Sequence, residues 1–166
     1  TETPRMLQET TAQLLAHLSD SNGWWRDTAQ QLLVLKQDKS VVPMLRQLAR
    51  TSDQLARIHA MWTLEGLGAA DAAFLREMMK DADPQVRTQA IRVSESLYKA
   101  GDKSFADDYK SMTSDADTDV VIQAMMTLNT LKVPDAATVV RATVAANRAR
   151  GVQLIGPQIL NPPAGV

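Results

Sequence analysis

The sequence repeats one short pattern four times, and this repetition constrains the fold more than any other feature. Each copy has a polar residue, a hydrophobic or aromatic residue and, in three copies, an Arg ahead of an Ala. The alanines lie 31, 30 and 34 residues apart. Such a period is typical of solenoid proteins, in which each unit buries its apolar face only against its neighbours. The four repeat alanines are Ala29, Ala60, Ala90 and Ala124.

Apolar residues recur at helical spacing, and no segment alternates convincingly with period two, so we expect helices and no sheet. Helices are predicted over about 4–17, 24–36, 53–67, 70–80, 84–98, 103–113, 118–131, 135–149 and 152–160, with one more opening after a Ser40 cap. The predicted fold class is all-α: a right-handed α-α superhelix of four to five helix pairs. Residues 1–160 form the repeat domain, and 161–166 form a proline-containing linker or tail.

The second helix of each pair carries an apolar stripe that passes through the repeat alanine. We expect a small residue there because two helices must approach closely at that point. Trp25 lies on the same stripe, four residues before Ala29, and is therefore predicted to pack in the core.

Charge and composition exclude several classes of function. The net charge is −1, which implies no broad attraction to nucleic acid or to anionic membranes. No apolar run approaches the roughly 18 residues of a membrane span, so no membrane insertion is expected. The absence of cysteine excludes disulfides, thiolate metal sites and cysteine nucleophiles. The chain starts with Thr1 rather than Met, so we expect a processed or excised piece of something larger.

The third copy of the pattern, DPQVRTQA over residues 83–90, resembles the signature of HEAT repeats of the short class of about thirty residues. The resemblance covers roughly residues 5–160. It implies that the Asp caps the second helix of each pair and that the Arg reaches an Asp of a neighbouring repeat. Val121 replaces the Arg in the fourth copy, so this ladder should stop there. The residues that match the ladder are Arg26, Arg57, Arg87, Asp53 and Asp83.

Two longer segments carry a narrower resemblance. Residues 22–33 (NGWWRDTAQQLL) and 56–68 (ARIHAMWTLEGLG) are similar to the HEAT region of large exported bacterial proteins. Those proteins join a sugar-dehydrogenase-like propeller to a cytochrome c domain. The resemblance implies a periplasmic or exported spacer or docking module, whose partners are flanking domains of the parent chain. This chain has no Cys-x-x-Cys-His, so the haem is not in this piece, and we expect no cofactor.

One row of positions on the second helices is mostly polar, and we expect it to form the concave, solvent-facing ridge. Trp62 is out of place in such a row unless a partner protein or a neighbouring repeat covers it. Trp24 lies off the apolar stripe, where it either covers the end of the repeat or anchors a partner. The predicted partner-binding residues are Trp24, His59, Trp62, Gln89 and Arg92, and the row also includes Thr28, Gln31, Gln123 and Met126.

Motifs for metal binding and catalysis are missing from the sequence. His17 and His59 lack the spacing of a zinc site, and the Asp-rich stretch 115–119 lacks the glycine and the terminal Glu of a calcium loop. No serine sits in a nucleophile elbow, and Gly66 and Gly68 end a helix rather than open a phosphate loop. We therefore expect no catalytic residue and no metal.

The main hypothesis is a non-catalytic scaffold or protein-interaction module. The alternative is a HEAT-like enzyme that uses its concave face, of the DNA alkyl-purine glycosylase or phycobilin lyase type, with Trp24, Trp62 and Asp27 in the site. A DNA-acting enzyme needs a strongly basic concave face, and the predicted ridge carries only one Arg. A bilin lyase needs an apolar crevice of pigment size.

Overall fold

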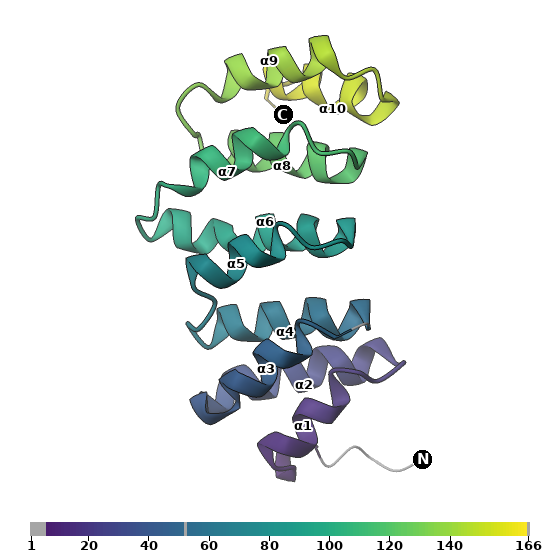
Figure 1. Cartoon of the computed structure of the whole chain (residues 1–166), viewed down its shortest axis with the longest axis vertical. Helices are drawn as coiled ribbons and strands as arrows, with labels where there is room; N and C mark the ends of the chain where they lie inside the picture. The colour runs from purple at the N-terminus through teal and green to yellow at the C-terminus, as the bar shows by residue number, and fades with distance from the viewer. Residues whose placement is uncertain (1–5, 52, 166) are drawn as a thin grey trace. The chain divides into compact units, whose positions relative to one another are not determined.

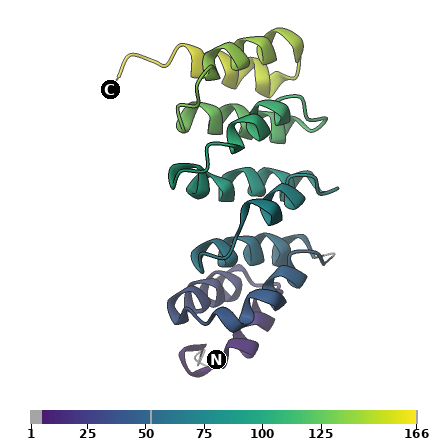
Figure 2. The same cartoon turned by 60° about the vertical axis from the view of Figure 1, so that its left-hand side comes forward.

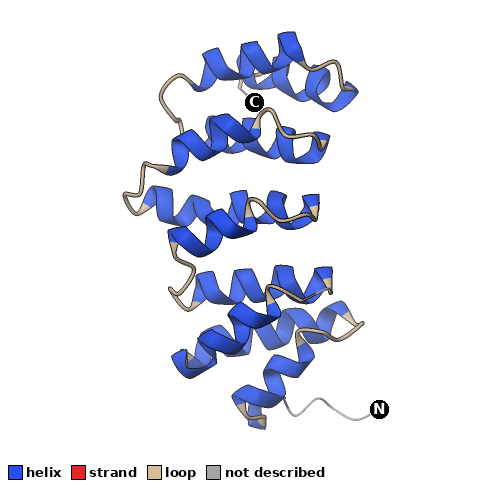
Figure 3. Cartoon of the chain, viewed as in Figure 1, coloured by secondary structure: helices blue, strands red, loops and turns tan. Residues whose placement is uncertain are grey.

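The computed structural model describes residues 6–51 and 53–165. All regular structure in these residues is helical (Figure 3). In this part of the chain, ten α-helices follow one another as five pairs, so the predicted all-α solenoid class is confirmed. The helices, labelled in Figure 1, are α1 Thr11–His17, α2 Gly23–Lys36, α3 Val42–Leu48, α4 Gln54–Gly66, α5 Ala72–Met78, α6 Pro84–Lys99, α7 Phe105–Met112, α8 Thr118–Thr130, α9 Ala136–Ala146 and α10 Arg150–Leu160. Short 3-10 helices, η1 Met6–Gln8 and η2 Lys39–Val41, precede α1 and α3.

The helices group into two compact units, a first unit of residues 1–74 and a second unit of residues 75–166. The boundary falls inside α5. In the first unit, α2 packs against both α1 and α4, and α3 packs against α4. Ala29 and Ala60 are completely buried, as the repeat pattern predicts. Helices α2 and α4 come so close that a Cβ on Gly66 would lie 2.5 Å from Cγ2 of Val34.

In the second unit, α8 lies between α6 and α10 (Figures 1 and 2). Ala90 and Ala124 are again completely buried. The core between α6 and α7 holds a buried hydrogen bond of 2.6 Å between the hydroxyl groups of Ser94 and Tyr109. The α8–α10 contact is apolar, because Val121, Met125, Val140 and Val152 form one buried cluster there.

Side-chain caps explain where the second helix of each repeat begins. Asn22, Asp53, Asp83 and Asp117 each adopt extended backbone angles and accept a hydrogen bond from an amide in the first turn. The Asp caps implied by the family resemblance are therefore present. Because the cap fixes the first turn, it also fixes which face of each helix carries the repeat alanine.

Three predicted boundaries were wrong. The helix expected over about 4–17 is interrupted, because Thr10 and Gln13 form a capping box that starts α1 at Thr11; its predicted start at Thr3 and Pro4 lies outside the described residues. Ser40 does not cap α3, because its amide and hydroxyl both donate to Asp38, which caps η2 instead. The predicted helix over about 135–149 ends at Ala146.

Candidate functional site

The candidate site lies on one face of α2 and α4 in the first unit, which we call the α2–α4 face. On α2, the exposed residues Trp24, Asp27, Gln31 and Leu35 are three or four positions apart and therefore share one side of the helix. Trp24 is 54% exposed and Leu35 is 76% exposed, which is unusual for large apolar side chains. The α4 side is contributed by His59, Trp62 and Glu65, all of them partly buried.

A hollow of about 470 Å³ lies between α2 and α4, in the carboxyl-terminal half of this face. Aliphatic groups of α2 and the Trp62 ring give it apolar walls, while Glu65 supplies its one charged group. Gly66, one of its lining residues, lets the two helices approach closely at their carboxyl ends. The residues that line it are Gln30, Gln31, Val34, Leu35, Trp62, Glu65 and Gly66.

His59 connects the two helices of the face. Its Nδ1 donates to Oε1 of Gln30 over 2.7 Å, and its Nε2 lies 3.8 Å from Oδ1 of Asp27. Burial lowers the pKa of His59, and the attraction of Asp27 opposes that shift only in part, while Arg26 adds to it. His59 is therefore neutral near pH 7, and its role in this geometry is to fix Gln30 beside the hollow.

The basic side chains of α2 and α4 point away from this face. Arg26 donates to the carbonyl of Asp20 over 2.6 Å, and Lys36 donates to the carbonyl of Glu9 over 2.6 Å. Arg57 donates to the carbonyl of Ala49 over 2.9 Å. The acidic residues of the same two helices, Asp27 and Glu65, belong to the face itself, so its own charge is negative.

The prediction that Trp25 packs in the core was wrong, because its side chain is only partly buried. Its ring stacks on His17 of α1 with centroids 4.9 Å apart, and it meets Trp24 edge to face at 5.5 Å. A histidine of α1 thus covers one face of this ring. The aromatic pair at the start of α2 thus forms one end of the α2–α4 face.

The remaining predicted partner-binding residues lie on α6 in the second unit. Gln89 is partly buried and Arg92 is exposed. Met126, from the same predicted row on α8, is 43% exposed. Within the second unit, this side of α6 and α8 is thus accessible, as the row pattern predicts.

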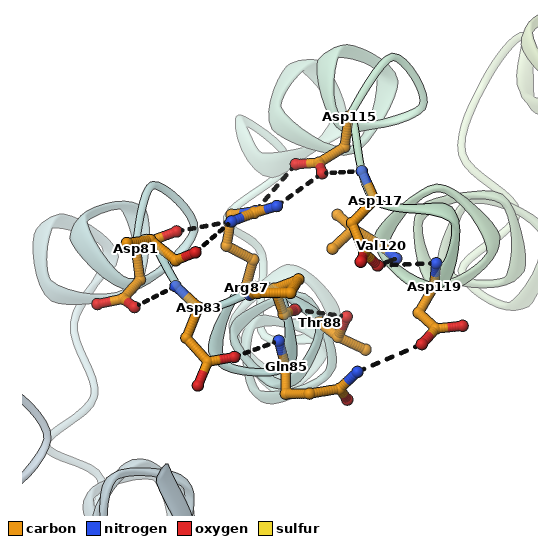
Figure 4. Close-up of polar contacts among 11 residues, drawn as sticks. Asp81, Asp83, Gln85, Arg87, Thr88, Asp115, Asp117, Asp119 and Val120 are labelled. Carbon is orange, nitrogen blue, oxygen red and sulfur yellow. Dashed lines mark hydrogen bonds and ion pairs between the residues drawn. The ribbon is translucent and has the colours of Figure 1, made fainter. Parts of the chain in front are cut away.

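Arg87 makes the contact between repeats that the family resemblance implies (Figure 4). Its Nε and Nη2 donate to the two carboxylate oxygens of Asp115 over 3.0 and 2.8 Å, and its Nη1 donates to the carbonyl of Asp81 over 2.8 Å. Burial raises the pKa of Asp115, but the bonds from Arg87 and from the Asp117 amide outweigh it and lower the pKa overall. The pair joins the third repeat to the fourth.

The carboxylate that pairs with Arg87 sits two residues ahead of a cap, which sequence reasoning missed. Asp53 and Asp83 cap their own helices, whereas the partner of Arg87 is Asp115, two residues before the cap Asp117. The Asp115 carboxylate also accepts from the Asp117 amide, so it is held in place for the arginine. An Asp two residues before the cap is visible in the sequence at 20, 81 and 115 and could have revealed this.

A second set of inter-repeat contacts lies on the first helices of the pairs and was also missed. Arg46 of α3 pairs with Asp71 at 3.0 Å, and Arg76 of α5 pairs with Asp108 of α7 at 3.0 Å. The Arg76 guanidinium also lies over the Phe105 ring, 4.6 Å from its centroid. The available signal was spacing, since Arg46 and Arg76 each precede a repeat alanine by 14 residues.

Among the residues that the structure describes, no group of three His, Asp or Glu side chains is placed to hold a metal ion. In the same part of the chain, every helix is too short or too polar to cross a bilayer. The arrangement is thus a surface with apolar anchors and a shallow hollow.

A comparison with protein families gives a match to the model of HEAT repeats over residues 11–95, which is slightly more than half of the chain. A search of curated proteins finds no match. The matched range includes three of the four repeat alanines, the caps Asn22, Asp53 and Asp83, and the ladder arginines Arg26, Arg57 and Arg87. The chain belongs to the HEAT-repeat family.

Proposed function

We propose that this chain is a non-catalytic module that docks a partner protein on its α2–α4 face. HEAT repeats generally serve as protein-interaction scaffolds, and this part of the proposal follows from membership of the family. The observation that carries the choice of face is the hollow lined by Trp62 and Leu35. Partly desolvated Trp side chains in pockets commonly dominate the energy of protein interfaces.

The charge of the face supports a protein partner over nucleic acid. Asp27 and Glu65 repel phosphates, whereas a DNA-acting enzyme needs a basic surface. The partner segment that fits is an apolar side chain flanked by Lys or Arg, because the hollow has apolar walls and an acidic rim. We also propose, from the sequence resemblance alone, that the partner is a flanking domain of a larger exported protein of the dehydrogenase and cytochrome type.

A displayed library of random twelve-residue peptides, panned against the whole chain, tests the choice of face. We expect enriched peptides whose affinity falls at least thirtyfold on Trp62→Ala, which corresponds to about 2 kcal/mol. Leu35→Ser is the second variant, because Leu35 is so exposed that its replacement leaves the fold intact. Leu154→Ala, at an exposed leucine of α10, is the matched control and should leave the affinity unchanged.

Enriched peptides that bind both the Trp62 and the Leu35 variants as tightly as the original chain would rule out this face, and so would a failure to enrich any peptide family. The finer proposal on the parent protein has its own test. Calorimetric titration with the domains encoded beside this segment in the same reading frame should show binding that Trp62→Ala weakens. A reading frame without such domains, or domains that do not bind, would contradict it.

A further inference from the structure

The second unit contains a groove of about 880 Å³ between α7 and α9, which we call the α7–α9 groove. It runs from the carboxyl end of α7 along the length of α9, and none of its lining residues belongs to the α2–α4 face. Its walls consist of hydroxyl groups and small side chains, with a cation on each side. The lining residues include Lys110, Asp115, Thr138, Ala142, Ala146 and Arg148.

The charge of the groove is positive. Lys110 and Arg148 form no ion pair with any residue that the structure describes. The one carboxylate of the lining, Asp115, is already neutralised by its two hydrogen bonds from Arg87. Two cations therefore face the groove with no acidic partner of their own.

The sequence around the groove shows the same imbalance on a larger scale. Residues 136–166 contain three arginines and no Asp or Glu, while residues 1–135 contain 15 basic and 19 acidic residues. The net charges are therefore +3 and −4, which sum to the −1 of the whole chain. The chain thus concentrates its excess positive charge on the last helix pair, next to the groove.

We infer that the α7–α9 groove binds an acidic, extended segment of a partner protein, with carboxylates of that segment on Lys110 and Arg148. Charge complementarity selects an anionic ligand. Ala142 and Ala146, one helical turn apart, leave room for a backbone to lie close to α9. The volume is within the range of about 300–1,000 Å³ found for ligand sites, enough for a few residues of extended chain.

The lining of the groove favours a peptide over a nucleic acid. The hydroxyl groups of Thr113 and Thr143 donate to carbonyls of their own helices, so their oxygen atoms can still accept hydrogen bonds. A peptide has backbone amides that can donate to these oxygens while its carboxylates meet the cations, whereas a phosphate chain has no such donors. The lining also contains no aromatic ring on which a base could stack.

An array of twelve-residue peptides with graded Glu content, probed with the whole chain, tests this inference. We expect the signal to rise with the number of Glu residues and to fall when each Glu is replaced by Gln. The dissociation constant of the best peptide, measured by fluorescence anisotropy, should rise at least tenfold in the double variant Lys110→Glu, Arg148→Glu. Raising the salt concentration should weaken binding to the original chain more than to the variant.

Arg141→Glu is the matched control, because Arg141 is an exposed arginine of α9 that does not line the groove. It should change the dissociation constant less than threefold, and Trp62→Ala should leave it unchanged, which separates this site from the α2–α4 face. Equal losses in Arg141→Glu and in the double variant would overturn the inference, as would equal binding of the Gln peptides. Tighter binding of a single-stranded oligonucleotide at the same residues would overturn the assignment to a peptide.

Discussion

Replacement of Arg87 by Met is the sharpest test of the energetics described above. The change removes four hydrogen bonds, two to the Asp115 carboxylate and two to the carbonyls of Asp81 and Ala82, and leaves the carboxylate without its cation. The side chains of Arg87 and Asp115 are only 16% and 14% exposed, so water replaces the lost partners poorly. Breaking a buried pair costs about 3–5 kcal/mol, and the remaining exposure reduces our expectation to about 2–3 kcal/mol.

The same chain supplies a matched control at a more exposed pair. The N–O distance between Arg46 and Asp71 is 3.0 Å, similar to the 2.8 Å of the Arg87–Asp115 pair, but the two side chains are 37% and 57% exposed. Pairs of this kind contribute up to about 1 kcal/mol, so Arg46→Met should cost much less than Arg87→Met. Arg46 also makes fewer hydrogen bonds, one to the Asp71 carboxylate and one to the carbonyl of Ala69, so the contrast tests burial together with the number of bonds lost.

Urea unfolding followed by circular dichroism measures both free energies of unfolding. All three tryptophans lie between residues 24 and 62, so their fluorescence reports the first unit and should respond to Arg46→Met rather than to Arg87→Met. A double-mutant cycle with Asp115→Asn should give a coupling of at least about 1 kcal/mol. Equal costs for Arg46→Met and Arg87→Met, or a coupling near zero, would refute the argument from burial.

Three further changes test the packing and titration of the repeats. Ala90→Leu should overpack the close approach of α6 and cost about 1–3 kcal/mol in urea unfolding, whereas an unchanged midpoint would show that the helices are not tightly apposed there. Asp117→Ala removes a cap that accepts two amide bonds and should cost about 1 kcal/mol, which Asp117→Asn should largely restore. Because the pKa of His59 is lowered in the folded state, its contribution to the free energy of unfolding should be complete above about pH 6.5 and should decline as the pH falls through the lowered pKa. An identical dependence of unfolding free energy on pH in His59→Gln would contradict this.

The repeat alone was enough to predict the fold class and the alanine positions. The spacing of the repeats and the small alanine at one position of each repeat both reflect helix packing. That packing depends on local sequence and on a neighbouring copy of the same pattern. The errors arose at helix starts, where side-chain hydrogen bonds decide which residue opens the helix. Thr10 and Gln13 start α1 later than the predicted boundary. The amide and the hydroxyl of Ser40 donate to Asp38, so Ser40 does not cap the next helix.

The candidate site could be predicted only in part, because its residues come from different helices. The row pattern identified Trp62 and His59, since a Trp among polar positions stands out in one helix. It missed Leu35 and Glu65, which join Trp62 only because Gly66 and Val34 bring α2 and α4 together. It also placed the ladder carboxylates at the caps, because the distance that Arg87 spans to Asp115 depends on how one repeat stacks on the next.

The change from Arg87 to Val121 at one register gives the second unit two kinds of joint. The α6–α8 joint includes a charge pair, and the α8–α10 joint is an apolar cluster with no ion pair among its described residues. Apolar contacts weaken on cooling, while partly exposed ion pairs weaken in salt. Cold should therefore loosen the last helix pair first, and high salt should loosen the preceding joint first. The α6–α8 joint and the α8–α10 joint would then respond to different conditions. Hydrogen exchange at low temperature and at high salt would show protection lost in different helices.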